Sequence, residues 1–348
     1  MGRLQLRYIL ALAAIVVAGC TNDVQHGNGN PGGCVQDCCA GSSGGGGSGG
    51  CPGPPPPIVD FPATAIFYQD ISAAPVDAES RPIIETLQAI GFGGAVEVGG
   101  GYDPNFLVEN GETAPITELL AIPDCDTAPV PVPALWMRAV NCAHSPECDL
   151  LVKKPARLYE IQNAALTDGA FSGTCLAVWD LTRDYWATSS VGASYGRGDG
   201  CRGVDDSGLP LAPLVYQSYY DLFQPVTHAL RLTLPADRVR ADAYVHPATH
   251  IGAASGGTYA VPVGARLRLK ATFPESNEDS DLEVVRALKK YGAFVAGSSP
   301  TPLIASDGWA LVGGFIVTGV QPSDFEVVEA GPRIDFAAQT CKRVPIRE

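Results

Sequence analysis

The densest alternation of apolar and polar residues lies between Thr227 and Phe273. His228–Leu234 and Arg266–Phe273 carry leucine or another apolar residue at every second position, and Arg240–His246 alternates in the same way. Successive side chains of a β-strand point to opposite faces, so this period of two predicts three strands, each with an apolar and a polar face. The Gly, Pro and Asp residues between them supply turn signals.

Short apolar runs elsewhere in the chain also have strand character. They are Leu158–Ile161, Leu176–Leu181, Leu214–Tyr220 and Leu311–Thr318. Two helices are predicted, Ala78–Ile90 and Asp281–Tyr291, each followed by a glycine, and Ser280 with Glu283 forms a capping box for the second. Many short strands with two short helices predict a mainly β single domain of the β-sandwich or jelly-roll type.

The first 57 residues differ in composition from the rest. Residues 1–20 combine Arg3 and Arg7 with a short apolar run and end in Val-Ala-Gly-Cys, which is typical of a signal peptide. This ending resembles a bacterial lipobox, in which Cys20 is diacylated and anchors the mature chain in a lipid bilayer. An ordinary signal peptide with a chance cysteine and an uncleaved anchor are the alternatives. Thr21 instead of Asp after the cysteine favours, by the same resemblance, the outer membrane.

Residues 21–57 are rich in Gly, Ser and Pro and predict a flexible tether that reaches about 30–35 Å. Residues 58–348 have the composition of a β-rich globular domain. The arrangement predicts an outer-membrane lipoprotein of the cell envelope, either periplasmic or exposed at the surface.

Charge and cysteine content narrow the class of protein. A formal net charge of −14 argues against a nucleic-acid partner, because phosphate binding needs a basic surface. The eleven cysteines of an exported chain indicate disulfides. Apart from Cys20, an even set lies in the tether and another in the domain, but the sequence does not choose their pairing. Cys142 and Cys148 flank His144 without the paired spacing of a zinc site, so neither a metal nor a cofactor is predicted.

One candidate site is a basic strand face. Alternation places Arg266 and Arg268 on one face, and if the three central strands adjoin, Arg231 and Tyr244 join them. Such a groove suits an anionic polysaccharide such as a polyuronate, with arginines neutralising a carboxylate while tyrosine and histidine exchange the proton of a β-elimination. The alternative is a solvated face of long charged side chains.

A second candidate is the carboxyl pair Glu160 and Asp180. Each interrupts an apolar strand beside aromatic residues, and glycoside hydrolysis needs two carboxyl groups across the scissile bond. Burial raises the pKa of a carboxyl group, as a general acid requires. Trp179 would stack on a sugar ring, although a tryptophan in a β core also packs there without binding anything.

The histidines allow structural and catalytic interpretations. His228 lies at the edge of the leucine face, where a hydrogen-bonded structural histidine and a catalytic one are both consistent with the pattern. His246 and His250 have a spacing that suits a metal on a helix, but Pro247 and the strand context oppose that.

Several blocks resemble those of a family of exported bacterial proteins that has no established activity. They are DISAAPVD (Asp70–Asp77), RLYE (Arg157–Glu160), THALRLTLP, YVHPATH, VGARLRLKATF, RALKKYGAFVA and SDFEVV. The resemblance spans roughly residues 66–329 and implies one domain. It also ranks His228, Arg231, His250 and Glu160 above other polar residues. The family often has a histidine just before its LYE block, where this chain reads CDLLVKKPARLYE.

The sequence therefore predicts a tethered lipoprotein that binds or cleaves an extracellular polysaccharide, as a glycoside hydrolase or lyase would. The alternative is a non-catalytic envelope-binding or adhesion module. The predicted catalytic residues are Glu160, Asp180, His228, Tyr244 and His250, and the predicted binding residues are Arg231, Arg266, Arg268 and Trp179. An enzyme should hold Glu160 or His250 in a cleft beside a second titratable group, whereas a binding module should disperse them.

Overall fold

The computed structural model describes residues 61–99, 105–108, 124–130, 149–167, 170–186, 196–204, 206–216, 225–275, 279–305 and 315–343. These residues form a mainly β domain with two α-helices, which confirms the predicted fold class. Cys20, the predicted signal peptide (1–20) and the predicted tether (21–57) lie outside the described residues, as do Cys142 and Cys148.

The two α-helices lie within two residues of their predicted bounds. They are α1 (Ser80–Ile90) and α4 (Asp279–Lys290). The apolar stripe predicted for α1 is buried: Ile83, Ile84 and Leu87. Gly91 follows α1 with a φ of 68°, a left-handed value that glycine adopts without strain. Because α4 begins at Asp279, Ser280 lies inside the helix and not at its cap.

The largest sheet has seven strands. In spatial order they are β14 (Phe315–Ile316), β1 (Glu97–Val98), β13 (Leu303–Ile304), β8 (Leu230–Leu234), β12 (Ala293–Ser298), β11 (Arg266–Leu269) and β15 (Phe325–Val328). The β8/β12 and β1/β13 pairs are parallel and the other neighbours are antiparallel. The sheet is therefore mixed, unlike the antiparallel sheets of a jelly roll.

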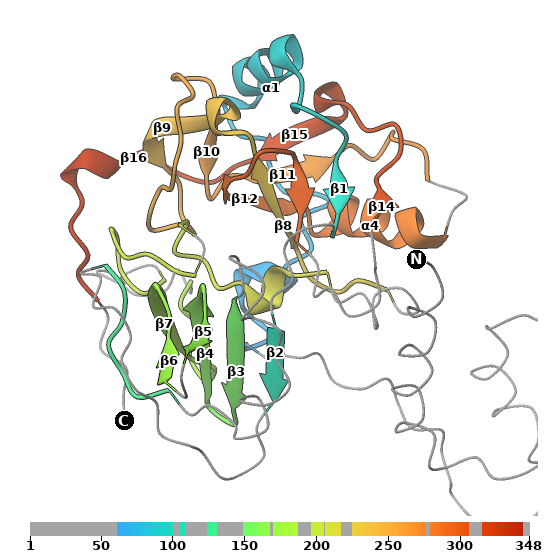
Figure 1. Ribbon diagram of the computed structural model, residues 1–348. Coiled ribbons are helices and arrows are strands. Elements are labelled where there is room, and N and C mark those ends of the chain that lie inside the picture. Colours follow the sequence, from blue (N-terminus) through green and yellow to red (C-terminus); the bar gives the residue numbers. More distant parts are fainter. Residues whose placement is uncertain are drawn as a thin grey trace, which may run out of the picture. The chain divides into compact units, whose positions relative to one another are not determined.

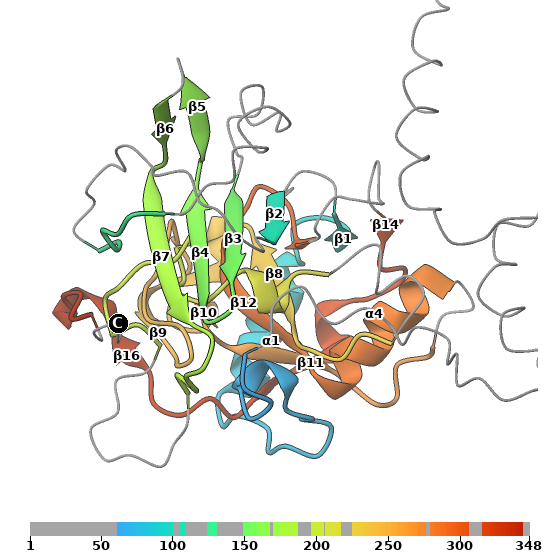
Figure 2. The same ribbon diagram turned by 90° about the horizontal axis from the view of Figure 1, so that it is seen from below.

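The remaining strands form smaller sheets. One contains β10 (Val261–Val263), β9 (Val239–Tyr244) and β16 (Ile334–Asp335). A second contains β2 (Asn105–Val108), β3 (Leu150–Lys154), β4 (Arg157–Gln162) and β7 (Cys175–Asp180), which lie side by side in Figure 2. A two-stranded ribbon joins β5 (Ala165–Thr167) to β6 (Ala170–Ser172).

Leucines cover one face of the seven-stranded sheet. Those of β8 and β11 belong to one buried cluster with side chains of α1 and α4: Leu230, Leu232, Leu234, Leu267 and Leu269. Figure 1 shows both helices beside strands of this sheet, and α1 contacts β15 while α4 contacts β11. The predicted leucine face is thus the main core of the domain.

The opposite face carries the arginines, as alternation predicts, but it is not solvated. Arg231, Arg266 and Arg268 expose only 5%, 5% and 7% of their surface. A second buried cluster covers this face, with Phe294 from β12, Trp179 from β7, and Phe67 from the segment that follows the tether. The predicted exposed basic groove is therefore wrong, because the sheet is covered on both sides.

Backbone carbonyl groups of residues 66–74 are the partners of two of these arginines. Arg266 donates from Nε to Tyr291 O at 2.6 Å, and from its terminal nitrogens to the carbonyls of Ile66 and Gln69 at 3.1 and 3.0 Å. Arg268 donates to the carbonyls of Ile71 and Ala74. A guanidinium group offers five N–H donors in a fixed fork. Each arginine can therefore bond several backbone carbonyl groups that have no partner within a helix or a sheet.

The predicted strand Leu214–Tyr220 is not a strand in its described part. Ala212–Leu214 is a 3₁₀-helix, and only Tyr216 pairs with a distant chain segment, by donating its N–H to Ala305 O. Pro213 lies in the first turn of this 3₁₀-helix, where its fixed φ suits a helix start and its missing N–H costs nothing.

Two disulfides confirm the prediction that the domain is cross-linked. Cys125 is bonded to Cys175, and Cys201 is bonded to Cys341. The first joins residues 124–130 to the start of β7, and the second joins the C-terminal segment to the loop at 196–204.

We predict that Arg266→Lys lowers the free energy of unfolding by about 3 kcal/mol, because a lysine replaces three forked donors by one ammonium group in a buried place. Burial already lowers the pKa of Arg266 to about 9. Urea denaturation measures the loss. Arg286→Lys, at a side chain that is 51% exposed, is the matched control and should stay within about 0.5 kcal/mol of the parent protein. Equal stability of both variants would contradict the role assigned to Arg266.

Candidate functional site

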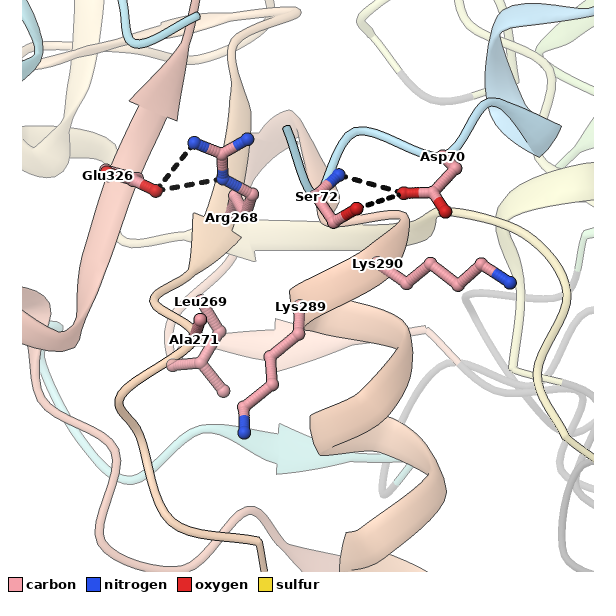
Figure 3. Close-up of a pocket in the computed structure, with 8 residues that line it drawn as sticks. All are labelled: Asp70, Ser72, Arg268, Leu269, Ala271, Lys289, Lys290 and Glu326. Atoms are coloured by element: carbon pink, nitrogen blue, oxygen red, sulfur yellow. Dashed lines mark hydrogen bonds and ion pairs between the residues drawn. The ribbon is translucent and has the colours of Figure 1, made fainter. Parts of the chain in front are cut away.

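A charged cleft of about 300 Å³ opens where four separate parts of the chain meet. It is lined by the segment before α1, the end of β11, the last turn of α4, and β15. Its lining residues are Asp70, Ser72, Arg268, Leu269, Ala271, Lys289, Lys290 and Glu326 (Figure 3). Three cations and two carboxylates thus share one small site in a chain of net charge −14.

Arg268 and Glu326 form one wall of the cleft. They lie opposite each other in the antiparallel β11/β15 register. The guanidinium Nε and one terminal nitrogen lie 2.9 and 2.7 Å from the same Glu326 oxygen. Arg268 also donates to the carbonyls of Ile71 and Ala74, so its guanidinium group is held from two sides.

Asp70 lies at the other end of the site, in a turn that its own side chain stabilises. Its Oδ1 accepts hydrogen bonds from the backbone N–H of Ser72 at 2.9 Å and from the Ser72 hydroxyl at 2.6 Å. These bonds lower the pKa of Asp70 below its ordinary value. The carboxylate is therefore charged at neutral pH, and its Oδ2 accepts no hydrogen bond from a described residue.

The lysines come from the C-terminal turn of α4, where cations are favourable because the helix dipole has its negative end there. The ammonium group of Lys290 lies 5.1 Å from the centre of the Tyr291 ring, and its pKa is raised by a hydrogen bond to Tyr291. Lys289 makes no ion pair or hydrogen bond with the part of the chain that the structure describes, and Figure 3 shows it beside Leu269 and Ala271. Lys289 is therefore the cation of this cleft that has no hydrogen-bond or ion-pair partner among the described residues.

A second cleft, of about 450 Å³, lies between the end of α1 and β14. Glycines and apolar residues line most of it, and none of its lining residues is titratable: Ile90, Gly91, Phe92, Gly93, Gly94, Ala95, Val96, Ile316, Val317, Gly319, Val320, Gln321 and Pro322. It offers neither charge nor acid–base chemistry, so the charged cleft is the better candidate.

Glu160 is buried as its sequence context predicts, but it is fully occupied. None of its surface is exposed. Its Oε1 accepts from the N–H groups of Leu211 and Ala212 at 2.8 and 2.9 Å, and its Oε2 accepts from Trp179 Nε1 at 2.9 Å. The carboxylate therefore joins β4 to the 3₁₀-helix at Ala212–Leu214.

Asp180 does not face Glu160. In the β4/β7 register Asp180 pairs with Arg157 and Glu160 pairs with Ala177, three positions further along, which places the two carboxyl groups on opposite faces of the sheet. Burial raises the pKa of Asp180, but hydrogen bonds from Thr182 and the ion pair with Arg157 at 3.0 Å outweigh it, so the pKa lies below its ordinary value. The predicted hydrolase pair is thus not assembled.

Trp179 is also unavailable to a sugar, because it is completely buried among aromatic rings. Its ring centre lies 5.2 Å from that of Tyr185 and 6.1 Å from that of Phe61. His228 is buried too, with Nδ1 2.8 Å from the carbonyl oxygen of Ala229. Both residues belong to the interior, which fits the packing interpretation of Trp179 and the structural interpretation of His228 and not their predicted binding and catalytic roles.

Tyr244 and His246 meet at Asp199, away from the arginine face. Asp199 Oδ1 accepts from the Tyr244 hydroxyl at 2.8 Å and lies 2.9 Å from His246 Nε2. Burial raises the pKa of Asp199, but the bonds from His246 and Tyr244 lower it further than burial raises it. Burial and the Asp199 carboxylate together raise the pKa of Tyr244, whose hydroxyl proton is held by its hydrogen bond to Asp199.

His250 lies in the same region, held by a different contact. Its Nδ1–H donates to Asp206 O at 2.7 Å, and its ring packs edge-on against Phe336 at 4.6 Å. Burial lowers its pKa, which favours the neutral ring. The predicted site residues are therefore dispersed, and Arg268 alone among them lines the charged cleft.

The other cleft residues were missed by sequence reasoning. Asp70, Lys289 and Glu326 fall in the blocks DISAAPVD, RALKKYGAFVA and SDFEVV, which carry the resemblance to the family of exported proteins. The sequence signal was that each of these three charged residues lies in such a block. Only the fold shows that the three blocks meet at one cleft.

Comparisons with protein-family models, with curated proteins and with solved structures give no match to this chain. Among the described residues no helix is long and apolar enough to cross a membrane. Within the same ranges, no group of three or more His, Cys, Asp or Glu side chains is arranged to hold a metal ion.

We predict that Glu160→Gln destabilises the domain by about 2–3 kcal/mol without changing ligand binding. The amide offers one oxygen and two N–H donors to a place where three N–H donors converge, so at least one donor loses its acceptor in a dry site. Thermal and urea unfolding measure the loss. A stable variant that loses a polysaccharide-dependent activity would instead support the catalytic interpretation of Glu160.

Proposed function

We propose that the protein is a lipid-anchored envelope protein whose β-rich domain binds an anionic extracellular polysaccharide without cleaving it. The observation that carries the proposal is Lys289 in the charged cleft. It is an ammonium group beside Lys290, in a concave site, with no counter-ion from the described chain. A carboxylate or sulfate group of a ligand supplies that counter-ion.

The dispersal of the predicted catalytic residues supports binding over cleavage. Glu160 and Asp180 face opposite sides of their sheet, whereas a glycosidase needs both carboxyl groups at one bond. Tyr244 has a raised pKa and is hydrogen-bonded to Asp199, which does not suit the base of a β-elimination. The hydrolase and lyase alternatives thus lack an assembled pair among the predicted residues.

The sequence supports the envelope location. The lipobox-like ending at Cys20 would give the mature chain an acylated N-terminus, and residues 21–57 would hold the domain clear of the bilayer. A binding module on such a tether can search for a polymer while it stays attached to the outer membrane, which suits an envelope-binding or adhesion role.

We predict that the full chain, purified in detergent, binds polygalacturonate and not neutral dextran, and that Lys289→Gln weakens binding about fivefold. That loss corresponds to roughly 1 kcal/mol for one exposed charge-assisted contact. Titration calorimetry at low and high salt measures it, and salt should weaken binding by screening.

Lys154→Gln, at a lysine on β3 outside the cleft, is the matched control and should bind as the parent does. The same samples are assayed for new reducing ends and unsaturated uronates, and neither should form. Equal affinity for dextran, unchanged binding by Lys289→Gln, or release of products would each overturn the proposal.

We predict that cells expressing the chain incorporate radiolabelled palmitate into it and that Cys20→Ser abolishes the label. The thiol of Cys20 is where acylation of a lipobox begins. Cys34→Ser, at a cysteine of the tether, is the control and should keep the label. Loss of the label from both variants, or from neither, would argue against an anchor at Cys20.

A further inference from the structure

We infer that the charged cleft recognises an amphoteric polysaccharide unit, in which a carboxylate and a free amino group lie on the same or adjacent sugars. This inference rests on the proposed function and narrows its ligand. The reason is that the cleft has two unmet charges of opposite sign, whereas a simple polyuronate carries only one kind.

The positive unmet charge is Lys289. Of the other two cations, Arg268 is bonded to Glu326 and to two backbone carbonyls, and Lys290 lies over the Tyr291 ring. Lys289 has neither an acidic partner nor a carbonyl partner among the described residues. A ligand carboxylate placed there gains a charge-assisted hydrogen bond without displacing an existing one.

The negative unmet charge is Asp70. Ser72 occupies Oδ1 with two hydrogen bonds and keeps the carboxylate ionised, while Oδ2 is left without a donor from the described chain. Asp70 also lies near enough to Lys290 and Arg266 for these cations to favour its charge, but neither donates a hydrogen bond to it. A ligand ammonium group is the partner that such an oxygen takes best.

Asp70 also disfavours a ligand that is only anionic. Inside the cleft, a uronate carboxylate bound at Lys289 also meets the ionised carboxylate of Asp70, and the two negative charges repel each other. A sugar unit with both groups places its carboxylate at Lys289 and its ammonium group at Asp70. The volume of about 300 Å³ is at the small end of ligand sites, which suits one such unit and not a long enclosed oligosaccharide.

The test compares hyaluronan with its partly N-deacetylated form at equal chain length, using the full chain in detergent. The two polymers share the same glucuronate carboxylates, and only the second has free amino groups. We expect the deacetylated polymer to bind at least about fivefold more tightly, which is about 1 kcal/mol. Asp70→Asn should remove this preference while leaving hyaluronan binding unchanged or stronger, and Lys289→Gln should weaken both.

One control separates the cleft from a general attraction of amines to an acidic protein, and one measurement checks that the Asp70 variant folds. Glu85→Gln removes an exposed carboxylate of α1 outside the cleft and should keep the preference. The asparagine amide oxygen still accepts from Ser72, so Asp70→Asn should fold, and circular dichroism with thermal unfolding checks it.

The outcomes separate the two proposals. Equal binding of both polymers, or a preference that survives Asp70→Asn, overturns the amphoteric ligand and leaves anionic polysaccharide binding standing. A preference that Glu85→Gln removes as fully as Asp70→Asn also overturns it. If neither hyaluronan, deacetylated hyaluronan nor polygalacturonate binds, the proposed function fails and this inference falls with it.

Discussion

The structure depends on two buried guanidinium groups of β11, the strand next to the edge strand β15 in the seven-stranded sheet. Arg266 and Arg268 bond the backbone carbonyls of residues 66–74, a stretch in which only Ile66–Tyr68 has regular structure. Carbonyl groups of an irregular segment are costly to bury without partners. The arginines meet that need, so the segment can cover a sheet face and bring Phe67 against Trp186 and Phe294. The hydrophobic packing on this sheet face therefore depends on the hydrogen bonds that the two arginines donate to the covering segment.

The same arrangement fixes the candidate site. Arg268 donates hydrogen bonds to the covering segment on one side and to Glu326 on the other, so contacts in both directions fix the position of its guanidinium group. Asp70 belongs to the segment that the arginines hold, and the backbone of Ile71 donates to the last carbonyl of α4, at Lys290. One set of contacts thus holds both the sheet face and the candidate site, in which Lys289 and one oxygen of Asp70 have no hydrogen-bond partner among the described residues.

Alternation along the chain correctly predicted which residues share a face, because side-chain direction in a strand is a local property. The core leucines of β8 and β11, both α-helices and the burial of Glu160 followed from such local patterns. What covers a face is not local: the carbonyls bound by Arg266 at Ile66 and Gln69 lie 200 and 197 residues away. The partners of Glu160 are likewise 51 and 52 residues distant. Arginines with such partners look the same in a sequence as solvated ones, so the predicted groove was wrong and the cleft was missed.

The bond between Cys201 and Cys341 spans 140 residues, and every strand of the seven-stranded sheet except β1 lies between these two cysteines. In the oxidised protein that portion of the chain is a closed covalent ring. A ring of this size loses unfolded-state entropy worth roughly 5 kcal/mol in the loop-closure account. Because the ring is covalent, a single peptide-bond cut inside it would open the ring without releasing a fragment. The disulfide would keep the two parts of the cut chain joined.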